Sequence, residues 1–245
     1  MRILVVNDDG IGSAGIHCLA GLAAQLGEVW VAAPDGQCSA MSHRISVYGS
    51  IDVKGEKDFP AEGVKAYRIG GTPADCVKVA LDYLMPQKPD LVFSGINHGY
   101  NVGMDILYSG TVGAAMEALV NGIPAMAFSS DDNRDRRVPD HYLIPLVKEL
   151  LSRKISANQI WNINFPSGDP RDVKGILEDR LICPKSAYKT VYTPLEGEDG
   201  RLSVSSILQP HAPEGTDMAA VFGGYISVGK VDSGVLAGKS KSVNV

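Results

Sequence analysis

Strand-like and helix-like segments alternate from the start of the chain to about residue 165, and no other feature of the sequence restricts the fold as strongly. Short aliphatic runs, of which residues 3–6 are the first, are typical of strands buried on both faces. Between these runs lie segments with apolar residues at helical spacing, such as the one that follows Ser13 and ends before Gly27. Because successive parallel strands need a crossover connection, this alternation predicts a parallel sheet covered by helices on both faces.

The expected elements follow one another at short intervals. One helix should begin after Thr72, which combines with Pro73 and Asp75 in a capping signature. Beyond residue 166 Pro, Gly, Lys and Asp become frequent, and we expect hairpins and loops that serve in oligomerisation. The chain is thus predicted to be one domain over 1–245, with an α/β core (1–166) and an extension (167–245). Strands are predicted over residues 3–6, 28–33, 67–69, 90–96, 125–129, 160–165, 202–208 and 225–231, and further helices over 111–120 and 141–153.

Size, charge and cysteine content exclude several classes of protein. A chain of 245 residues buries enough surface to fold without disulfides or a structural metal. Its four cysteines lack CxxC spacing, which argues against a zinc ribbon or a disulfide framework. The net charge of −5 provides no attraction to a nucleic-acid polymer or an anionic membrane. Because the first apolar stretch is too short for a signal peptide, we expect a cytoplasmic protein without a membrane partner.

The loop after the first strand matches the dinucleotide-binding pattern G-x-G-x-x-G. Asp35 follows at the end of the second strand, where such proteins place an acidic residue for the ribose. A nicotinamide-dependent oxidoreductase is therefore one candidate function. The glycines of the pattern are Gly10, Gly12 and Gly15.

Asp8 and Asp9 stand directly before these glycines and favour a different ligand. Two carboxylates would repel a pyrophosphate at this position, whereas Mg²⁺ and Mn²⁺ prefer carboxylate and other oxygen ligands. A simple Asp-Asp-Gly turn is the remaining alternative. Since ligands bind beyond the carboxyl ends of parallel strands, the metal site is the favoured interpretation.

Two further loops carry oxygen donors at predicted strand ends. Asn97 offers a neutral amide oxygen to a hard cation, Asn101 can donate to a phosphate, and His98 is a candidate for a functional role. In the loop after the second strand, Ser39 could coordinate a metal, and Ser42 or the following histidine could reach a phosphate. Turn-rich loops with structural asparagines are the alternative for both segments.

The helix predicted at 111–120 begins with small and hydroxylated residues. Free N–H groups and the positive end of the helix dipole favour an anion there, and Ser109 and Thr111 add hydroxyl donors. Helix capping alone would also explain these residues. Together, a cation at the aspartates and this helix start predict a site for a phosphoryl group, where a metal lowers the pKa of bound water. A phospho-accepting signalling domain also has an acidic pair after its first strand, but such domains are much shorter.

Long motifs along the chain resemble the stationary-phase survival protein SurE family. They are N-D-D-G at 7–10, A-P-D at 33–35, G-T-P-A-D-C-V at 71–77, P-D-L-V-x-S-G-I-N-x-G-x-N-x-G-x-D at 89–105, Y-S-G-T-V-G-A-A-M-E at 108–117, G-T-D at 215–217 and G-Y-I-S-V at 224–228. The resemblance therefore extends over nearly the whole chain.

The resemblance implies a metal-dependent 5′-nucleotidase, a phosphomonoesterase that acts on nucleoside 5′-monophosphates. Many members also act on 3′-monophosphates, and some on short polyphosphate. It further implies a Rossmann-like three-layer core whose C-terminal extension is exchanged between subunits of a homodimer or homotetramer. One divalent ion, Mg²⁺ or Mn²⁺, is expected in each subunit.

The resemblance also assigns roles to individual residues. The metal ligands fall on Asp8, Asp9, Ser39 and Asn97, and the phosphate contacts on Asn7, Asn101, Ser109, Gly110 and Thr111, with Ser42 a further candidate. We expect Asp8, Asp9, Asn7 and Asn101 to be catalytic and His98 to contact substrate. The chain departs from the family pattern at Gly36 and Ala40, which replace an arginine and a glycine, and at residues 229–231, where Gly-Lys-Val replaces Thr-Pro-Leu.

Overall fold

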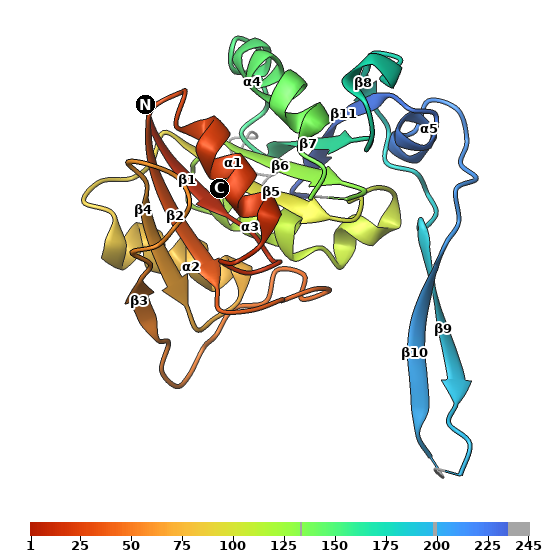
Figure 1. Ribbon diagram of the computed structural model, residues 1–245, viewed down its shortest axis with the longest axis horizontal. Helices are drawn as coiled ribbons and strands as arrows, with labels where there is room; N and C mark the ends of the chain where they lie inside the picture. The colour runs from red at the N-terminus through yellow and green to blue at the C-terminus, as the bar shows by residue number, and fades with distance from the viewer. Residues whose placement is uncertain (133, 198–199, 235–245) are drawn as a thin grey trace, which may run out of the picture.

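A nine-stranded mixed sheet forms the centre of the protein, with helices on both of its faces (Figure 1). This computed structural model describes residues 1–132, 134–197 and 200–234. The strand order is β3-β4-β2-β1-β5-β6-β7-β11-β8. The strands are β1 (Arg2–Val6), β2 (Glu28–Pro34), β3 (Val53–Gly55), β4 (Lys65–Ile69), β5 (Leu91–His98), β6 (Ala125–Ser130), β7 (Gln159–Phe165), β8 (Ile176–Arg180) and β11 (Ile226–Asp232).

The central strand β1 shows why the sheet is covered on both faces. Its residues 3–6 are fully buried, as the aliphatic run predicts. Ile3 and Val5 belong to one apolar core, which contains residues of α1 (Ala14–Ala23) and α4 (Arg137–Leu151). Leu4 and Val6 belong to a second core, with residues of α2 (Pro73–Val79) and α3 (Gly110–Val120). The predicted three-layer α/β core is confirmed.

Strands of both orientations make up the sheet. The six strands from β4 to β7 are parallel, as expected. Two antiparallel pairings were not predicted: β3 pairs with β4, and β11 pairs with β7 while β8 continues beyond it. The division of the chain at residue 166 stays a prediction, and β8 and β11, which follow that residue, complete the main sheet.

Most predicted elements are present with small shifts at their ends. The capping box of Thr72 and Asp75 is formed, but α2 is short and continues into a π-helical turn, η1 (Ala80–Leu84). The predicted helix at 141–153 begins earlier, at Arg137. Two short 3₁₀ turns, η2 (Met104–Leu107) and η3 (Pro170–Asp172), and helix α5 (Asp217–Phe222) were not predicted. Within the described residues, no helix is long and apolar enough to cross a membrane.

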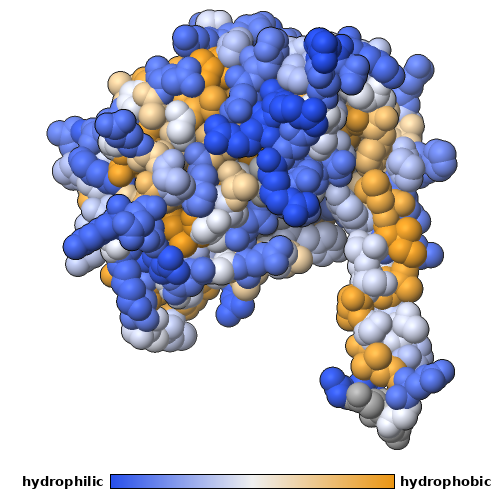
Figure 2. Space-filling model, viewed as in Figure 1, coloured by the Kyte–Doolittle hydropathy of each residue, from blue (hydrophilic) through white to orange (hydrophobic). Residues whose placement is uncertain are grey.

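A two-stranded antiparallel ribbon, which we call the arm, projects from the body (Figure 1). It consists of β9 (Tyr188–Pro194) and β10 (Leu202–Leu208). Every residue of β10 is exposed, and Figure 2 shows hydrophobic residues along the arm. Val204 stands opposite Tyr192, so the two side chains share a face of the ribbon. An isolated ribbon of this kind buries little apolar surface of its own.

Candidate active site

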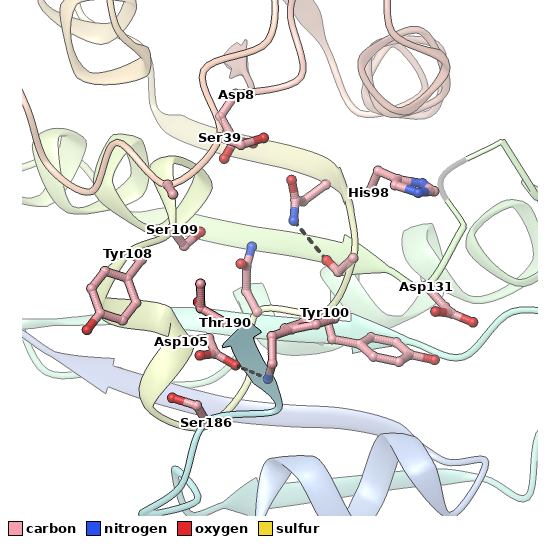
Figure 3. Close-up of a pocket in the computed structure, with 15 residues that line it drawn as sticks. Asp8, Ser39, His98, Tyr100, Asp105, Tyr108, Ser109, Asp131, Ser186 and Thr190 are labelled. Atoms are coloured by element: carbon pink, nitrogen blue, oxygen red, sulfur yellow. Dashed lines mark hydrogen bonds between the residues drawn. The ribbon is translucent and has the colours of Figure 1, made fainter. Parts of the chain in front are cut away.

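A cavity of about 720 Å³ lies beyond the carboxyl ends of β1 and β5, beside the start of α3 (Figure 3). This is the edge of the sheet where ligands of such folds bind. The cavity brings together residues from four separate loops of the core and, from the extension, Ser186, Tyr188 and Thr190 at the base of the arm. Six of the residues predicted from the sequence line it: Asp8, Ser39, Asn97, His98, Asn101 and Ser109.

Asp8 is the buried acid of the site, with 4% of its surface exposed. Its carboxylate accepts hydrogen bonds from the Thr111 hydroxyl (2.6 Å) and the Thr111 backbone N–H (3.2 Å) at the start of α3. Gly110 permits this approach, because a Cβ at that position would lie 2.9 Å from the Asp8 Cβ. Thr111 is therefore engaged with Asp8, and its predicted contact with phosphate stays a prediction.

Burial, together with the neighbouring charge of Asp9, raises the pKa of Asp8 to about 6 in spite of the hydrogen bonds from Thr111. Within the described chain, no lysine, arginine or histidine forms an ion pair with Asp8. A buried carboxylate without a cationic partner is costly at neutral pH. A bound cation would remove this cost and favour the ionised form.

Of the other three predicted metal ligands, Ser39 and Asn97 line the cavity together with Asp8, whereas Asp9 is not among its lining residues. The backbone N–H of Cys38 donates to the Asp8 carbonyl (2.7 Å), which places Ser39 next to the aspartate. Asp9 accepts from the backbone N–H of His98 (3.0 Å). Asn97 donates its amide N–H to the Gly99 carbonyl (2.8 Å), so its amide oxygen is the atom left to coordinate a cation.

This donor set fits a hard divalent cation. It combines two carboxylates with a hydroxyl and an amide oxygen, the ligand types that Mg²⁺ and Mn²⁺ prefer. In the described part of the chain no group of three or more His, Cys, Asp or Glu residues could hold a metal, so any site here depends on the neutral oxygens. The ligand roles of the four residues stay predictions.

Asn101 and Ser109 line the cavity with hydrogen-bond donors still available. Asn101 is buried. Its side-chain amide donates to Ser129 Oγ (2.8 Å), and its backbone carbonyl accepts from the side-chain amides of Asn162 and Asn164. The second amide hydrogen of Asn101 is thereby held in a fixed direction. Ser109 caps α3 by accepting from the Val112 N–H (3.1 Å), which leaves its hydroxyl proton to donate.

Four predicted phosphate contacts, Asn7, Ser42, Gly110 and Thr111, are not among the residues that line the cavity. Asn7 is fully buried and donates to the Gly10 carbonyl (2.9 Å) and to Ser13 Oγ (2.8 Å), which closes the loop before α1. Ser42 donates to the Leu107 carbonyl (2.8 Å) and ties its loop to η2. Both side chains have structural partners here, and their predicted contacts with substrate stay predictions.

The two histidines considered from the sequence lie in different surroundings. His98 lines the cavity, half exposed, with Nδ1 3.7 Å from an oxygen of Asp132. His43 lies outside the cavity and contacts Glu117 of α3, with 2.7 Å between Nε2 and Oε2. Burial alone would raise the pKa of Glu117, but the hydrogen bond from His43 and nearby positive charge hold it below its usual value. This pair, which ties the loop that carries Ser39 to α3, was not predicted from the sequence.

The far wall of the cavity was likewise not predicted from the sequence. It comes from Tyr100, Asp105 and Tyr108 of the core and from residues 186–190 at the base of the arm. Asp105 holds that base in place, because its carboxylate accepts from the backbone N–H groups of Ala187 (2.6 Å) and Tyr188 (3.0 Å). The aspartate that ends the motif at 89–105 was the one available signal of this wall.

Comparisons with known proteins find relatives over most of the chain. The sequence model of the family described as "Survival protein SurE" matches residues 3–186. The 5′-nucleotidase SurE of Thermoanaerobacter sp. (strain X514) is 38% identical over 235 residues, which cover 93% of this chain and 90% of the relative. The protein of the same name from Pelotomaculum thermopropionicum is 39% identical over 242 residues, covering 93% and 88%.

A solved structure is similar over almost the entire chain. The crystal structure of SurE protein from Aquifex aeolicus superposes with a TM-score of 0.79 at 34% identity and covers 98% of both chains. None of these similar proteins supports the nicotinamide-dependent oxidoreductase. In the structure, Asp35 of that alternative lies 3.5 Å from the Arg68 guanidinium.

Proposed function

The chain belongs to the SurE family, and from this premise we propose that it is a metal-dependent phosphomonoesterase that hydrolyses nucleoside 5′-monophosphates to nucleoside and phosphate. The curated relatives carry the name 5′-nucleotidase, which supports the substrate class. The observation that carries the proposal is the buried Asp8 beside Asp9 at the end of β1, in a cavity with the capped start of α3.

Asp8, Asp9, Ser39 and Asn97 are the residues that would hold one divalent cation, Mg²⁺ or Mn²⁺. Their oxygen donors suit such an ion, and the burial of Asp8 without an ion pair supports a cation beside it. When bound, the ion supplies Lewis acidity toward a phosphate oxygen and lowers the pKa of water.

The remaining residues act on the phosphoryl group and on the ligands. Ser109 and Asn101 donate hydrogen bonds to phosphate oxygens, whose negative charge increases during the reaction. Thr111 orients the Asp8 carboxylate through its two hydrogen bonds. Asn7 stabilises the loop that carries Asp8 and Asp9 by its hydrogen bond to the Gly10 carbonyl. His98, at the edge of the cavity, contacts the substrate.

The arm supports a homodimer or homotetramer. Its apolar residues Tyr192, Leu202, Val204 and Ile207 are each more than half exposed. Exposed apolar surface of this extent is typical of protein–protein contacts. A second copy of this chain is the partner that the family resemblance implies. The cytoplasm stays the proposed location, on the sequence features given above.

Phosphate release from nucleoside 5′- and 3′-monophosphates and from short polyphosphate, measured with Mn²⁺, with Mg²⁺ and with chelator, tests the proposal. We expect release from 5′-monophosphates that the chelator abolishes. Asp9→Asn should remove most of the activity while the circular dichroism spectrum stays unchanged. Asp58→Asn, which alters an exposed carboxylate away from the cavity, is the matched control. A folded wild-type protein that releases no phosphate with either metal would refute the proposal.

A further inference from the structure

The cavity is much larger than a phosphate and extends away from the predicted metal ligands. In Figure 3, Asp8 and Ser39 lie at the top of the view and Asp105 and Ser186 at the bottom, with Tyr108 between them at the left. The lower part is lined by the base of the arm and by η2 with its flanking residues. This part must accept the portion of the substrate that is not phosphate.

The chemistry of this lower part favours an uncharged group. Among the described residues that line the cavity, His98 is the basic side chain, and no lysine or arginine is present. Asp105 and Asp131 add negative charge to the wall. A second phosphate would be repelled here. The hydroxyls of Ser186 and Thr190, by contrast, can exchange hydrogen bonds with a sugar.

Tyr108, in this wall, is a large aromatic side chain that packs little against the rest of the protein. It lines the cavity with 60% of its surface exposed, and the described residues provide no hydrogen bond to its hydroxyl and no ring contact. Tyr100, in the same wall, is only 7% exposed and packs its ring edge-on against Phe222 at 5.7 Å. A large aromatic ring left open at a cavity is typical of a ligand contact.

The backbone at Tyr108 is nevertheless fixed. Its carbonyl accepts from the Ser42 N–H (2.9 Å), and its N–H donates to the Asp105 carbonyl (3.0 Å). Ser109, the next residue, is the cap of α3 and a predicted phosphate contact. The ring of Tyr108 is therefore held next to Ser109, a predicted hydrogen-bond donor to the phosphate. This spacing suits a ligand in which a sugar separates a flat group from a phosphate.

On these grounds, and resting on the function proposed above, we propose that the lower part of the cavity is the nucleoside subsite and that the substrate's base stacks on Tyr108. Stacking on a protein aromatic ring does not depend on the identity of the base, because every base has a π-face. The enzyme should accordingly accept purine and pyrimidine monophosphates and discriminate against nucleoside diphosphates and polyphosphate, whose additional charge the acidic wall repels.

The experiment compares substrates with and without a base. Wild type, Tyr108→Ala and Tyr108→Phe are assayed on adenosine 5′-monophosphate and on ribose 5-phosphate with saturating Mn²⁺. We expect Tyr108→Ala to raise the KM for the nucleotide on the order of tenfold relative to that for ribose 5-phosphate, and Tyr108→Phe to restore the wild-type ratio. Tyr83→Ala, which removes an exposed tyrosine of η1 outside this cavity, should leave both values unchanged.

The outcomes separate this inference from the proposed function. If wild type hydrolyses neither substrate, the phosphatase proposal fails. If wild type hydrolyses both and Tyr108→Ala affects them equally, the phosphatase proposal holds and the subsite assignment is wrong. The exposed neighbours Met104 and Leu107 offer another explanation, an interface between copies. A Tyr108→Ala protein with an altered sedimentation coefficient and an unchanged ratio of KM values would establish that explanation instead.

Discussion

The start of α3 and the arm depart in opposite ways from the usual pattern of a folded protein, in which charges are exposed and apolar side chains are buried. At the start of α3 a carboxylate, Asp8, is buried without an ion pair in the described structure. On the arm, apolar side chains such as Val204 and Ile207 are more than half exposed. Each arrangement costs free energy in the isolated chain, since charges favour water and apolar surface avoids it. We therefore expect each region to be completed by a partner, the first by the proposed cation and the second by another protein surface.

Asp8→Asn tests the first region and should have the largest effect. Loss of a predicted metal ligand should lower kcat/KM at least about a hundredfold, more than the loss of a residue that only orients a ligand. The unfolding free energy should not fall, because the substitution removes a buried charge whose ionisation costs up to about 3 kcal/mol. Steady-state kinetics and urea denaturation in chelator measure the two effects.

The pH dependence of stability adds a second readout for Asp8. Its pKa is raised in the folded protein, to about 6 from 3.8, so its stabilising contribution is complete below pH 3.8 and is lost as the pH rises through about 6. In chelator, the wild-type unfolding free energy should fall across this interval relative to that of Asp8→Asn. Equal pH profiles for the two proteins would show that the carboxylate is not held in a costly environment.

Val204→Asp tests the second region. If Val204 is buried between two copies, a charge there should weaken association at least tenfold, since burying a valine side chain contributes about 1.5–3 kcal/mol. Sedimentation velocity over a range of protein concentrations measures this. Ser203→Asp adds the same charge to the adjacent residue, which points to the other face of the ribbon, and is the matched control. Equal association of both variants with wild type would exclude this face from the interface.

Asp75→Asn sharpens the comparison, because Asp75 is a buried carboxylate that needs no ligand. Burial would raise its pKa, but hydrogen bonds from Ser46 N and Oγ and from Thr72 N lower it overall. We expect Asp75→Asn to reduce the unfolding free energy by about 1–3 kcal/mol at pH 7, unlike the substitution at Asp8. Urea denaturation measures this loss, with Asp58→Asn as the exposed control.

The pH dependence for Asp75 has the opposite sign to that of Asp8. A lowered folded pKa means that the stabilisation is present above pH 3.8 and is lost as the pH falls through the folded value. Wild type should therefore lose stability in this acidic range faster than Asp75→Asn does. A variant that follows the wild-type profile would contradict the contribution assigned to these hydrogen bonds.

The parts of the molecule that were predictable have local signals. The strands β1, β2, β5, β6 and β7 are largely apolar runs, and the site loops follow β1 and β5 at the carboxyl edge, so Asp8, Asn97 and Ser109 could be placed there from the sequence. Strand β3, of three residues, was not predicted. The pairing of β11 with β7 was not predictable, because an apolar run fits a parallel or an antiparallel neighbour equally well. Strand β8 has only two apolar residues, Ile176 and Leu177, followed by three charged ones, too short a run to predict a strand.

The wall of the cavity depends on contacts between distant parts of the chain. Asp105 binds backbone groups more than 80 residues later, and nothing in the local sequence specifies this pairing. The direction of the Thr111 hydroxyl, toward Asp8, follows from the packing of α3 against the end of β1. A motif can therefore identify which residues form a site before it can say which of them contact the ligand and which contact each other.

Ala40→Gly should have the smallest effect of the substitutions considered, and we expect it to raise rather than lower the unfolding free energy. Ala40 lines the cavity next to Ser39 with a φ of +56°, in the left-handed region, which costs an L-residue about 1–2 kcal/mol. Glycine relieves this cost but loses about 0.5–1 kcal/mol of backbone entropy, so a net gain of up to about 1 kcal/mol is expected. Ala61→Gly, at a position without positive φ, should instead destabilise the protein. If Ala40→Gly also raises kcat/KM, the strain at Ala40 displaces Ser39 from its best position. If only the unfolding free energy changes, the loop already holds Ser39 where the glycine-containing family pattern would place it.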